Sequence, residues 1–417
     1  MNMHYGQPVV ITGIGLICSL GGNRVDVWSH LLQGAPNMGP VTLFDATRHR
    51  IDDCVVAELP PGVLESRVEE IKARGFVPPR KGRFRWMVLS AAIEAFDDAA
   101  LDLGSPQDRA EGMVILGTMT AGSEEAERIA IMTELGKKPR VSDNIGKRPG
   151  IAMQDVTRAF DLSGPTFGLE AACASGASAV TLATRLIGSG STPWCLAGGA
   201  EASIIASSVK MVHALSIIPK SFSNDPNAAS RPFDKRREGY VPAEGACLLV
   251  LESEEHALAR GARPYARIKG VVDRSCNEHP TRMSTPFCRM VMEQVLENSK
   301  VRVDELGWIN AHATSTVHGD IREAQAIGEL VGETGVRVSA PKSMTGHLLG
   351  GSGAAEAAFS AMSLRDQQIP PTVNLEDQDP ECPIDCITSR TAADFRYVLS
   401  NSWGFGGTGS CIVLERV

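Results

Sequence analysis

Short runs of apolar, largely β-branched residues recur along the chain and end at glycine or acidic residues. The first covers residues 8–15, PVVITGIG, where the apolar run meets two glycines. Such a run, bounded by turn residues, is typical of a buried strand. We predict further strands at residues 112–117, 246–251, 268–272, 308–311 and 411–414.

Alanine-rich segments with helical spacing lie between these runs, at residues 87–100, 176–187, 321–331 and 354–364. Strands that alternate with helices predict an α/β fold. The strands at 246–251 and 411–414 each close on Leu-Glu after a glycine-rich approach, which indicates two related halves meeting near residues 253–265. Because no low-complexity segment or long linker separates them, we expect the halves to share one core.

Composition and charge exclude several classes of protein. The chain has 417 residues, of which 43% are hydrophobic, and a formal net charge of −8. It is therefore a folded protein of two or three units rather than a disordered chain. The acidic balance argues against nucleic acid as a partner, although a local basic patch is compatible with it.

The chain also lacks the features of an exported or membrane-spanning protein. No apolar stretch approaches the roughly 18 residues that cross a bilayer. A signal peptide has a Lys or Arg before its apolar run, and no Lys or Arg precedes the first apolar run here. The ten cysteines follow neither a disulfide framework nor a zinc-site spacing, which indicates reduced thiols. We expect a soluble cytoplasmic protein with no membrane span.

One cysteine, Cys173, stands among small residues directly before a predicted helix, in the segment EAACASGA at residues 170–177. At a helix N-terminus the N–H groups and the helix dipole favour an anion. They can lower the pKa of a thiol from near 8.5 towards roughly 3.5–7.5, which makes it a nucleophile. Most free cysteines are small buried residues, so this segment alone leaves a catalytic and a structural role open.

Two histidines lie in turns that follow apolar runs. His312 belongs to NAHATST at residues 310–316, and His347 closes PKSMTGH at residues 341–347. The carboxyl end of a strand is where open α/β sheets place their sites. A lone histidine is more often structural, but two in such turns favour catalysis.

A glycine-dense turn, NSWGFGGTG, covers residues 401–409. Glycines let the backbone approach a substrate closely, so that N–H groups can face a developing oxyanion. A phosphate loop and a plain turn are the alternatives. A P-loop requires Gly-Lys-Ser/Thr after the glycines, and the segment has none.

With these four segments in this order, the chain resembles the β-ketoacyl-acyl carrier protein synthases, the condensing enzymes of fatty acid and polyketide assembly, most closely the type II elongating branch. VITGIG at 10–15 and ASRPFDK at 229–235 belong to the resemblance, which runs nearly end to end. The 139 residues from Cys173 to His312 and the 35 from His312 to His347 are similar to the family's spacing.

The resemblance implies a thiolase-like fold, in which two pseudo-symmetric αβαβα halves form a five-layered sandwich. The expected halves are residues 1–255, with the nucleophile, and residues 256–417, with the two histidines. By position, Cys173 takes the acyl chain as a thioester, while His312 and His347 bind the malonyl thioester carbonyl and stabilise the enolate. No metal or bound cofactor is implied.

Further roles follow from the same resemblance. The N–H groups of Cys173 and Phe405 form the oxyanion hole, and the ring of Phe405 is a gate. Lys342 and Glu356 organise the histidines. His279 and Thr281 match the family's second, mobile gate. For each position a structural role alone is the alternative.

Several residues depart from the family pattern, among them Ala243, Ala313 and Gly409. Thr120 stands where elongating synthases often carry a bulky aliphatic residue at the end of the acyl tunnel, so we predict that a longer or more rigid chain is accepted. These departures make a specialised polyketide or polyene pathway a rival to primary fatty acid synthesis, and the sequence does not decide between them.

The expected partners are an acyl carrier protein and the acyl and malonyl thioesters it carries. Carrier proteins of this kind are acidic, so Arg80, Lys81 and Arg83, near a helix start, form a predicted docking patch, with a solvated charge run as the alternative. We expect a homodimer, or a heterodimer with a related ketosynthase-like subunit.

Three other functions are weighed against this one. A degradative thiolase normally needs a second catalytic cysteine and uses coenzyme A. A non-condensing partner subunit, such as a chain-length factor, lacks the nucleophile that Cys173 supplies here. A papain-like cysteine protease needs one histidine and an oriented asparagine, and has no use for His347.

Overall fold

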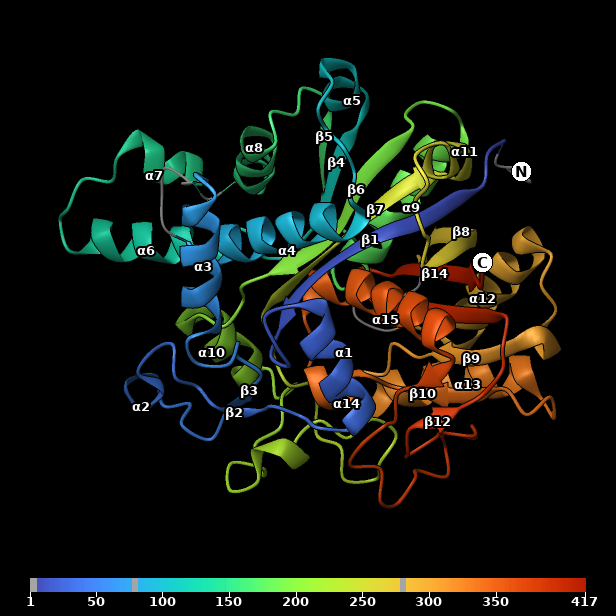
Figure 1. Ribbon diagram of the computed structural model, residues 1–417. Coiled ribbons are helices and arrows are strands. Elements are labelled where there is room, and N and C mark those ends of the chain that lie inside the picture. Colours follow the sequence, from blue (N-terminus) through green and yellow to red (C-terminus); the bar gives the residue numbers. More distant parts are fainter. Residues whose placement is uncertain (1–5, 77–81, 147, 278–282) are drawn as a thin grey trace.

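The computed structural model describes residues 6–76, 82–146, 148–277 and 283–417. Its main element is a ten-stranded sheet to which each part of the chain contributes five strands (Figure 1). The first five strands are β1 (Val9–Cys18), β4 (Met113–Gly117), β5 (Thr166–Leu169), β6 (Trp194–Glu201) and β7 (Gly245–Ser253). The second five are β8 (Ala266–Ser275), β9 (Leu306–Asn310), β10 (Arg337–Ser339), β13 (Tyr397–Gly404) and β14 (Thr408–Glu415).

The two sets of strands pair in the same way along the order β10-β9-β13-β14-β8-β1-β7-β6-β4-β5. In each set three strands run parallel (β5, β4, β6 and β10, β9, β13), and the other two join antiparallel. The sets meet where β1 pairs with β8, Val9 opposite Ile268. The sheet thus has the internal repeat that the resemblance implies. The boundary at residues 255 and 256 stays a prediction.

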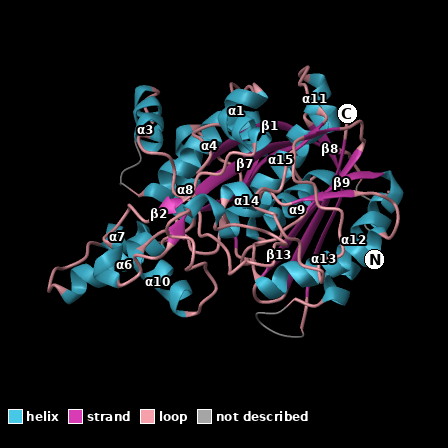
Figure 2. Ribbon diagram, turned by 90° about the horizontal axis from the view of Figure 1, so that it is seen from below, coloured by secondary structure: helices cyan, strands magenta, loops and turns pink. Residues whose placement is uncertain are grey.

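Helices lie in three layers around the two halves of the sheet, as the two views in Figures 1 and 2 show. The central layer is α9 (Ser175–Gly188) against α15 (Ser352–Asp366). The outer layers are α4 (Arg83–Ala99) with α8 (Gly150–Ala159) on the first half, and α12 (Thr285–Ser299) with α13 (Val317–Val331) on the second. The expected α/β/α/β/α sandwich is therefore present.

The central layer depends on small side chains. α15 is buried along nearly its whole length, and its buried alanines are Ala354, Ala355, Ala357, Ala358 and Ala361. A methyl group at these positions buries apolar surface without separating the helix from α9 or from the two half-sheets. The segments that carry Cys173 and His347 lie shortly before the N-termini of these two helices.

The remaining elements connect the layers or cap the sheet edges. The other helices are α1 (Arg24–Gln33), α2 (Ala46–His49), α3 (Val63–Ala73), α5 (Pro106–Glu111), α6 (Ser123–Glu134), α7 (Val141–Gly146), α10 (Ala206–Ala214), α11 (Glu254–Ala259) and α14 (Lys342–Thr345). Short strand pairs are β2 (Gly39–Pro40) with β3 (Val55–Val56), and β11 (Gln368–Ile369) with β12 (Thr391–Ala392). Single 3₁₀-helical turns lie at Pro226–Ala228, Val303–Glu305 and Leu349–Gly351. Within the described ranges, no helix is both long enough and apolar enough to cross a membrane.

Every strand and helix predicted from the pattern is present, with longer bounds in most cases. Several strands were missed, including β6 and β13, because glycine and buried polar residues interrupt their apolar runs. In β6, a Cβ on Gly199 would lie 2.5 Å from the carbonyl oxygen of Gly350. Glycine is required there for the close approach of the turn before α15, a tertiary reason that a strand pattern does not carry.

Candidate active site

Cys173 lies in a tight turn between β5 and the N-terminus of α9, as predicted. Ala172 has a φ of +48°, in the left-handed region that residues with a Cβ rarely adopt. The Ser175 hydroxyl holds the turn, since it accepts from the Ala171 N–H at 2.8 Å and donates to the Ala172 carbonyl at 2.6 Å. The strained turn directs the Cys173 side chain into a buried site.

The Cys173 thiol does not show the lowered pKa that its helix N-terminus predicts. Burial raises its pKa to about 12, aided by the nearby carboxyl of Glu201 and opposed by Lys342 and the N–H groups of Phe405 and Cys173. The prediction was wrong because it considered the helix terminus and not the loss of water around the sulfur. Cys173 is a neutral thiol in this state.

The glycine turn between β13 and β14 packs against the Cys173 turn. The Thr408 hydroxyl donates to the Ala171 carbonyl oxygen at 2.9 Å, and a Cβ on Gly404 would lie 2.6 Å from that same oxygen. The turn therefore needs glycine to approach Cys173 this closely. The Phe405 N–H hydrogen-bonds the sulfur, whereas Phe405 as a whole residue is 45% exposed.

His312 follows β9, and α13 holds its backbone. The N–H groups of His312 and Ala313 donate to the buried carboxylate of Glu323 at 2.9 and 2.7 Å. The Nδ1 atom of His312 lies 3.2 Å from the ammonium of Lys342. Because an ammonium can only donate, Nδ1 is the acceptor, and the ring proton of His312 sits on Nε2.

His347 lies opposite, with its ring centroid 5.4 Å from that of His312 at an interplanar angle of 86°. The backbone N–H of His347 donates to the Val241 carbonyl at 2.8 Å, and its ring Nδ1 is 2.9 Å from the Ser352 hydroxyl. Tyr240 packs edge-on against its ring. Burial, with Lys342 adding to it, lowers the pKa of both histidines well below 6.5. Both imidazoles are therefore neutral.

Lys342 and Glu356 form a buried ion pair behind the histidines, each side chain 2% exposed. Lys342 starts α14, and Glu356 projects from α15. Burial raises the pKa of Glu356 to about 7 against the lowering effect of Lys342. The Ser230 hydroxyl donates to the Lys342 carbonyl at 2.7 Å, which fixes the backbone from which the ammonium reaches His312.

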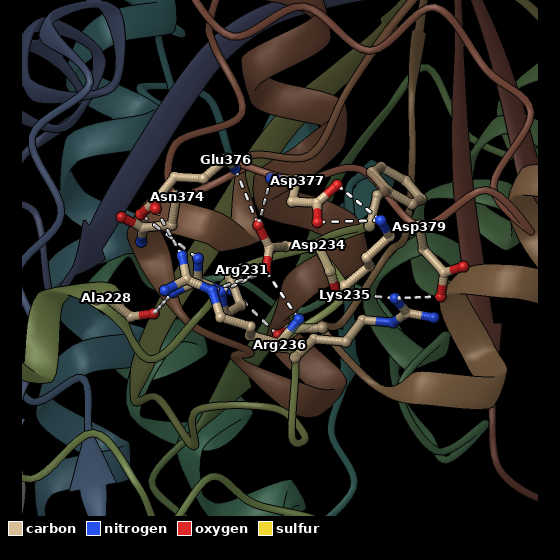
Figure 3. A network of polar contacts seen from close by, with 12 residues as sticks. Ala228, Arg231, Asp234, Lys235, Arg236, Asn374, Glu376, Asp377 and Asp379 are labelled. Atoms are coloured by element: carbon tan, nitrogen blue, oxygen red, sulfur yellow. Dashed lines mark hydrogen bonds and ion pairs between the residues drawn. The ribbon is translucent and has the colours of Figure 1, made fainter.

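The ASRPFDK segment is the scaffold behind that backbone (Figure 3). The Arg231 guanidinium bonds the buried Asp234 carboxylate at 2.9 Å, and the other oxygen of Asp234 accepts from the N–H groups of Glu376 and Asp377 at 2.9 and 3.0 Å. Lys235 pairs with Asp377 at 2.9 Å. The network fastens the segment at 229–235 to the loop after β11, beside the Lys342 turn.

Thr120 lies in a loop held by the fully buried carboxylate of Glu201. Glu201 accepts from the Thr120 hydroxyl at 2.7 Å, the N–H groups of Met119 and Thr120 at 2.9 Å, and the Gly350 N–H at 3.0 Å. Met119 packs against the apolar cluster that contains Cys173. The loop therefore lies close to the nucleophile, and the acyl-pocket role of Thr120 stays a prediction.

Arg83, the remaining predicted residue that the structure describes, is not part of this cluster. Arg83 donates from its Nε to the buried Glu244 at 2.9 Å, so its charge is compensated. Arg80, Lys81, His279 and Thr281 lie outside the described residues.

Four contact residues went unrecognised in the sequence: Ser352 and Tyr240 at His347, Glu323 at His312, and Glu201 beside Cys173. Ser352 lies in the GGSG segment at residues 350–353, shortly after His347, and Glu323 is three residues after Asp320 on the helix that follows His312. The closeness of each residue in sequence to a candidate histidine is a signal that could have identified it. Glu201 and Tyr240 carried none.

Comparison with known proteins gives consistent matches over the chain. The model of the β-ketoacyl synthase N-terminal domain matches residues 6–257, and that of the C-terminal domain matches residues 265–376. The 3-oxoacyl-[acyl-carrier-protein] synthase 2 of Synechocystis sp. is 34% identical over 98% of both chains. The protein of that name from Staphylococcus aureus (strain COL) is 32% identical over 99% of both.

Solved structures agree with these matches. The ishigamide ketosynthase/chain length factor has a TM-score of 0.89 at 28% identity and covers 99% of both chains. A β-ketoacyl synthase from Burkholderia phymatum STM815 has a TM-score of 0.87 at 30% identity, and covers 99% of this chain and 100% of its own. AntDE:AntF, a type II polyketide synthase acyl-carrier protein in complex with its ketosynthase bound to the hexaketide, has a TM-score of 0.86 at 25% identity, with the same coverage.

Proposed function

The chain belongs to the β-ketoacyl synthase family, and from this premise we propose that it extends an acyl chain held on Cys173 by decarboxylative condensation with malonyl-acyl carrier protein. It is an acyltransferase of the 3-oxoacyl synthase type. One observation carries the assignment of the site: a buried thiol, two N–H groups at its sulfur and two neutral imidazoles meet in one place.

In the first step the Cys173 sulfur attacks the thioester carbonyl of the acyl carrier protein. The new carbon–sulfur bond forms as the bond to the carrier sulfur breaks, and the thiol proton ends on the departing carrier thiol. The carbonyl oxygen carries the negative charge in the tetrahedral intermediate, and the N–H groups of Cys173 and Phe405, which bond the sulfur in the free protein, are the donors for that oxygen. Such donors stabilise the charge without reorganisation.

In the second step the malonyl carboxylate leaves as CO₂, and its electron pair moves into an enolate. The enolate oxygen accepts from the Nε2–H groups of His312 and His347. The lowered pKa values support this role, because a neutral donor loses no proton to the substrate and its hydrogen bond strengthens as the oxygen gains charge. The buried ammonium of Lys342 adds to the stabilisation.

In the third step the enolate carbon attacks the acyl carbonyl on Cys173. The second oxyanion occupies the same pair of N–H groups, and its collapse releases the β-ketoacyl chain on the carrier protein. The thiolate of Cys173 then takes up a proton from solvent. The N-terminal half thus supplies the nucleophile and the C-terminal half supplies both histidines, the division we propose for residues 1–255 and 256–417.

We further infer a homodimer. In the described part of the chain, β5 pairs only with β4 and forms one end of the sheet, and Phe167 on it is 41% exposed. An exposed edge strand is a template for pairing with another chain. Further exposed apolar side chains lie on α6, on the residue after it and on α7: Ile131, Leu135, Val141 and Ile145. The alternative is a heterodimer with a ketosynthase-like subunit. The mass of the purified protein in solution distinguishes them, because only a homodimer has twice the mass of this chain.

We expect the enzyme to work in the cytoplasm, as the free thiols of Cys382 and Cys386 support.

We also propose that the acyl carrier protein docks at the basic segment before α4. Replacing both Arg80 and Lys81 by Glu is expected to raise KM for the carrier-bound substrate while kcat changes little, because docking precedes chemistry. Arg263→Glu with Lys300→Glu, at two exposed cations of the other half, is the control. Equal effects of both pairs would refute the docking surface.

Intact-protein mass spectrometry tests the function. The protein is mixed with acyl-acyl carrier proteins of varied chain, including polyunsaturated chains, and then with the malonyl donor. We expect an acyl adduct on wild type that the malonyl donor discharges, none on Cys173→Ala, and on His312→Ala an adduct that persists. An adduct on Cys173→Ala, or normal discharge by His312→Ala, would contradict the mechanism. The preferred chain identifies the pathway.

A further inference from the structure

A group of side chains of metal-binding type lies on the surface, apart from the catalytic residues. Asp53 and Cys54 belong to the turn between α2 and β3, and His213 belongs to the last turn of α10. Residues 53 and 213 are far apart in sequence, yet α10 packs against α2, and Figure 1 shows the two helices close to β3. The carboxylate, thiol and imidazole ligand atoms all lie within 4.8 Å of one another.

The spacing is near that of a tetrahedral zinc site. With metal–ligand bonds of 2.0–2.3 Å, a tetrahedron places nitrogen and oxygen ligands about 3.3 Å apart, and sulfur about 3.6 Å from either. The Nε2 atom of His213 lies 3.0 and 3.3 Å from the two carboxylate oxygens of Asp53. The distance between His213 and Asp53 is therefore already that of two zinc ligands. Only Sγ of Cys54 has to move closer to these two ligand atoms, by at most about 1.2 Å.

The burial of the three ligands also fits an ion that enters from solvent. Cys54 is only 2% exposed, whereas the side chains of His213 and Asp53 are 20% and 42% exposed. The thiol therefore forms the inner wall, and the outer side is open for a water ligand. Cys54 and Val209, one turn before His213 on α10, belong to one buried apolar cluster. An apolar shell of this kind strengthens the bonds to the ion.

We propose that Asp53, Cys54 and His213 bind a divalent transition-metal ion, Zn²⁺ by preference. One thiolate, one imidazole and one carboxylate form a mixed sulfur, nitrogen and oxygen set that suits zinc and not magnesium or calcium. Binding replaces water on the hydrated ion by the three side chains, and the proton of the Cys54 thiol is released to the buffer. Two negative ligands then balance the charge of the ion.

A bound metal ion would link the turn at residues 50–54 to α10 through its three ligands. Cys173 and Tyr240 belong to the same apolar cluster as Cys54, so the ion stiffens the packing that surrounds the catalytic thiol. The site is independent of the proposed reaction, since none of its three ligands contributes to the chemistry. Its test therefore needs no activity measurement.

Co²⁺ is the first probe, because it binds at zinc sites in place of Zn²⁺ and its complexes absorb light. Zn²⁺ is the second probe. All proteins carry Cys173→Ala, so that the catalytic thiol is not a ligand. We expect one Co²⁺ per chain with a thiolate-to-metal absorption band. Cys54→Ser should abolish the band, and His213→Gln should weaken binding at least about tenfold, since even indirect partners of metal ligands contribute that much. Zn²⁺ should raise Tm only when all three ligands are present.

Two control variants match these changes in residue type. Cys386→Ser removes a half-buried thiol of the other half, and His318→Gln removes an exposed histidine. Both should bind Co²⁺ as the parent does. Because His213 is partly exposed, His213→Gln tests the site even if Cys54→Ser does not fold. No thiolate band in the parent, a band unchanged in His213→Gln, or one lost equally in either control would overturn the proposal.

Discussion

Replacing Ser352 by Ala tests whether the ring orientation of His347 controls decarboxylation. The Ser352 hydroxyl lies 2.9 Å from Nδ1 of His347, and both side chains are almost fully buried. While the hydroxyl donates to Nδ1, the ring proton stays on Nε2, the atom that would face the enolate oxygen. Without it, His347 loses its fixed tautomer and one restraint on its ring.

The size of the effect follows from the burial. Leaving a buried polar atom without its partner costs about 1–3 kcal/mol. If that cost falls on the transition state for decarboxylation, the rate drops about 5- to 150-fold, since each 1.36 kcal/mol is a factor of ten. In the proposed mechanism acyl transfer to Cys173 depends on the N–H groups of Cys173 and Phe405 and not on His347, so its rate is expected to stay within about twofold.

The assay follows the two steps separately. Release of CO₂ from malonyl-acyl carrier protein reports decarboxylation, and the mass of the acyl-enzyme reports transfer. Ser363→Ala is the matched control, because Ser363 lies on the same helix, is buried, and bonds the Gln368 carbonyl away from the site. Wild-type decarboxylation in Ser352→Ala, or an equal loss in both steps, would refute the role assigned to this hydroxyl.

Two further predictions concern chain length and pH. Thr120→Ile should shorten the longest acyl chain accepted, whereas Thr120→Val, which removes the bond to Glu201 at nearly constant volume, should not; a competition assay with carrier-bound chains checks both, and equal preferences would contradict the volume argument. Burial raises the pKa of Asp320 to about 7 from its ordinary 3.8, despite the Arg237 cation. Its contribution to stability is therefore full below pH 3.8 and lost as the pH rises through 7. Between pH 5 and 8, wild type should lose about 2–3 kcal/mol more of its free energy of unfolding than Asp320→Asn, as measured by urea denaturation. Parallel pH profiles would contradict this.

The fold and the central residues were predictable because their signals are local. Each of Cys173, His312, His347 and Phe405 stands in a short segment of small or glycine residues next to an apolar run. Such segments carry their structural reason with them: close approach, a left-handed turn, or the end of a strand. The α/β alternation is likewise a property of neighbouring residues, and every predicted strand and helix is present.

What the sequence did not reveal depends on burial and on contacts between distant segments. The helix terminus alone favours a lowered pKa for Cys173, but the turn between β13 and β14 packs against the Cys173 turn, and burial of the thiol raises its pKa. Arg83 appeared to be a free surface cation, yet its guanidinium reaches Glu244, which is 161 residues away in the chain. Propensity and motif cannot supply such partners, because they exist only once both halves have folded.

The charges of the site explain why it suits decarboxylation better than general acid–base chemistry. Lys342 is a buried cation whose ammonium contacts both the Glu356 carboxylate and Nδ1 of His312. Burial of the imidazoles and the positive charge of Lys342 both disfavour a charged ring, so both imidazoles stay neutral. A neutral imidazole can donate a hydrogen bond through its N–H, but it is not an acid that protonates the substrate. In the proposed mechanism the enolate oxygen is thus stabilised as an anion and not protonated, and the enolate carbon keeps the electron pair that forms the new bond.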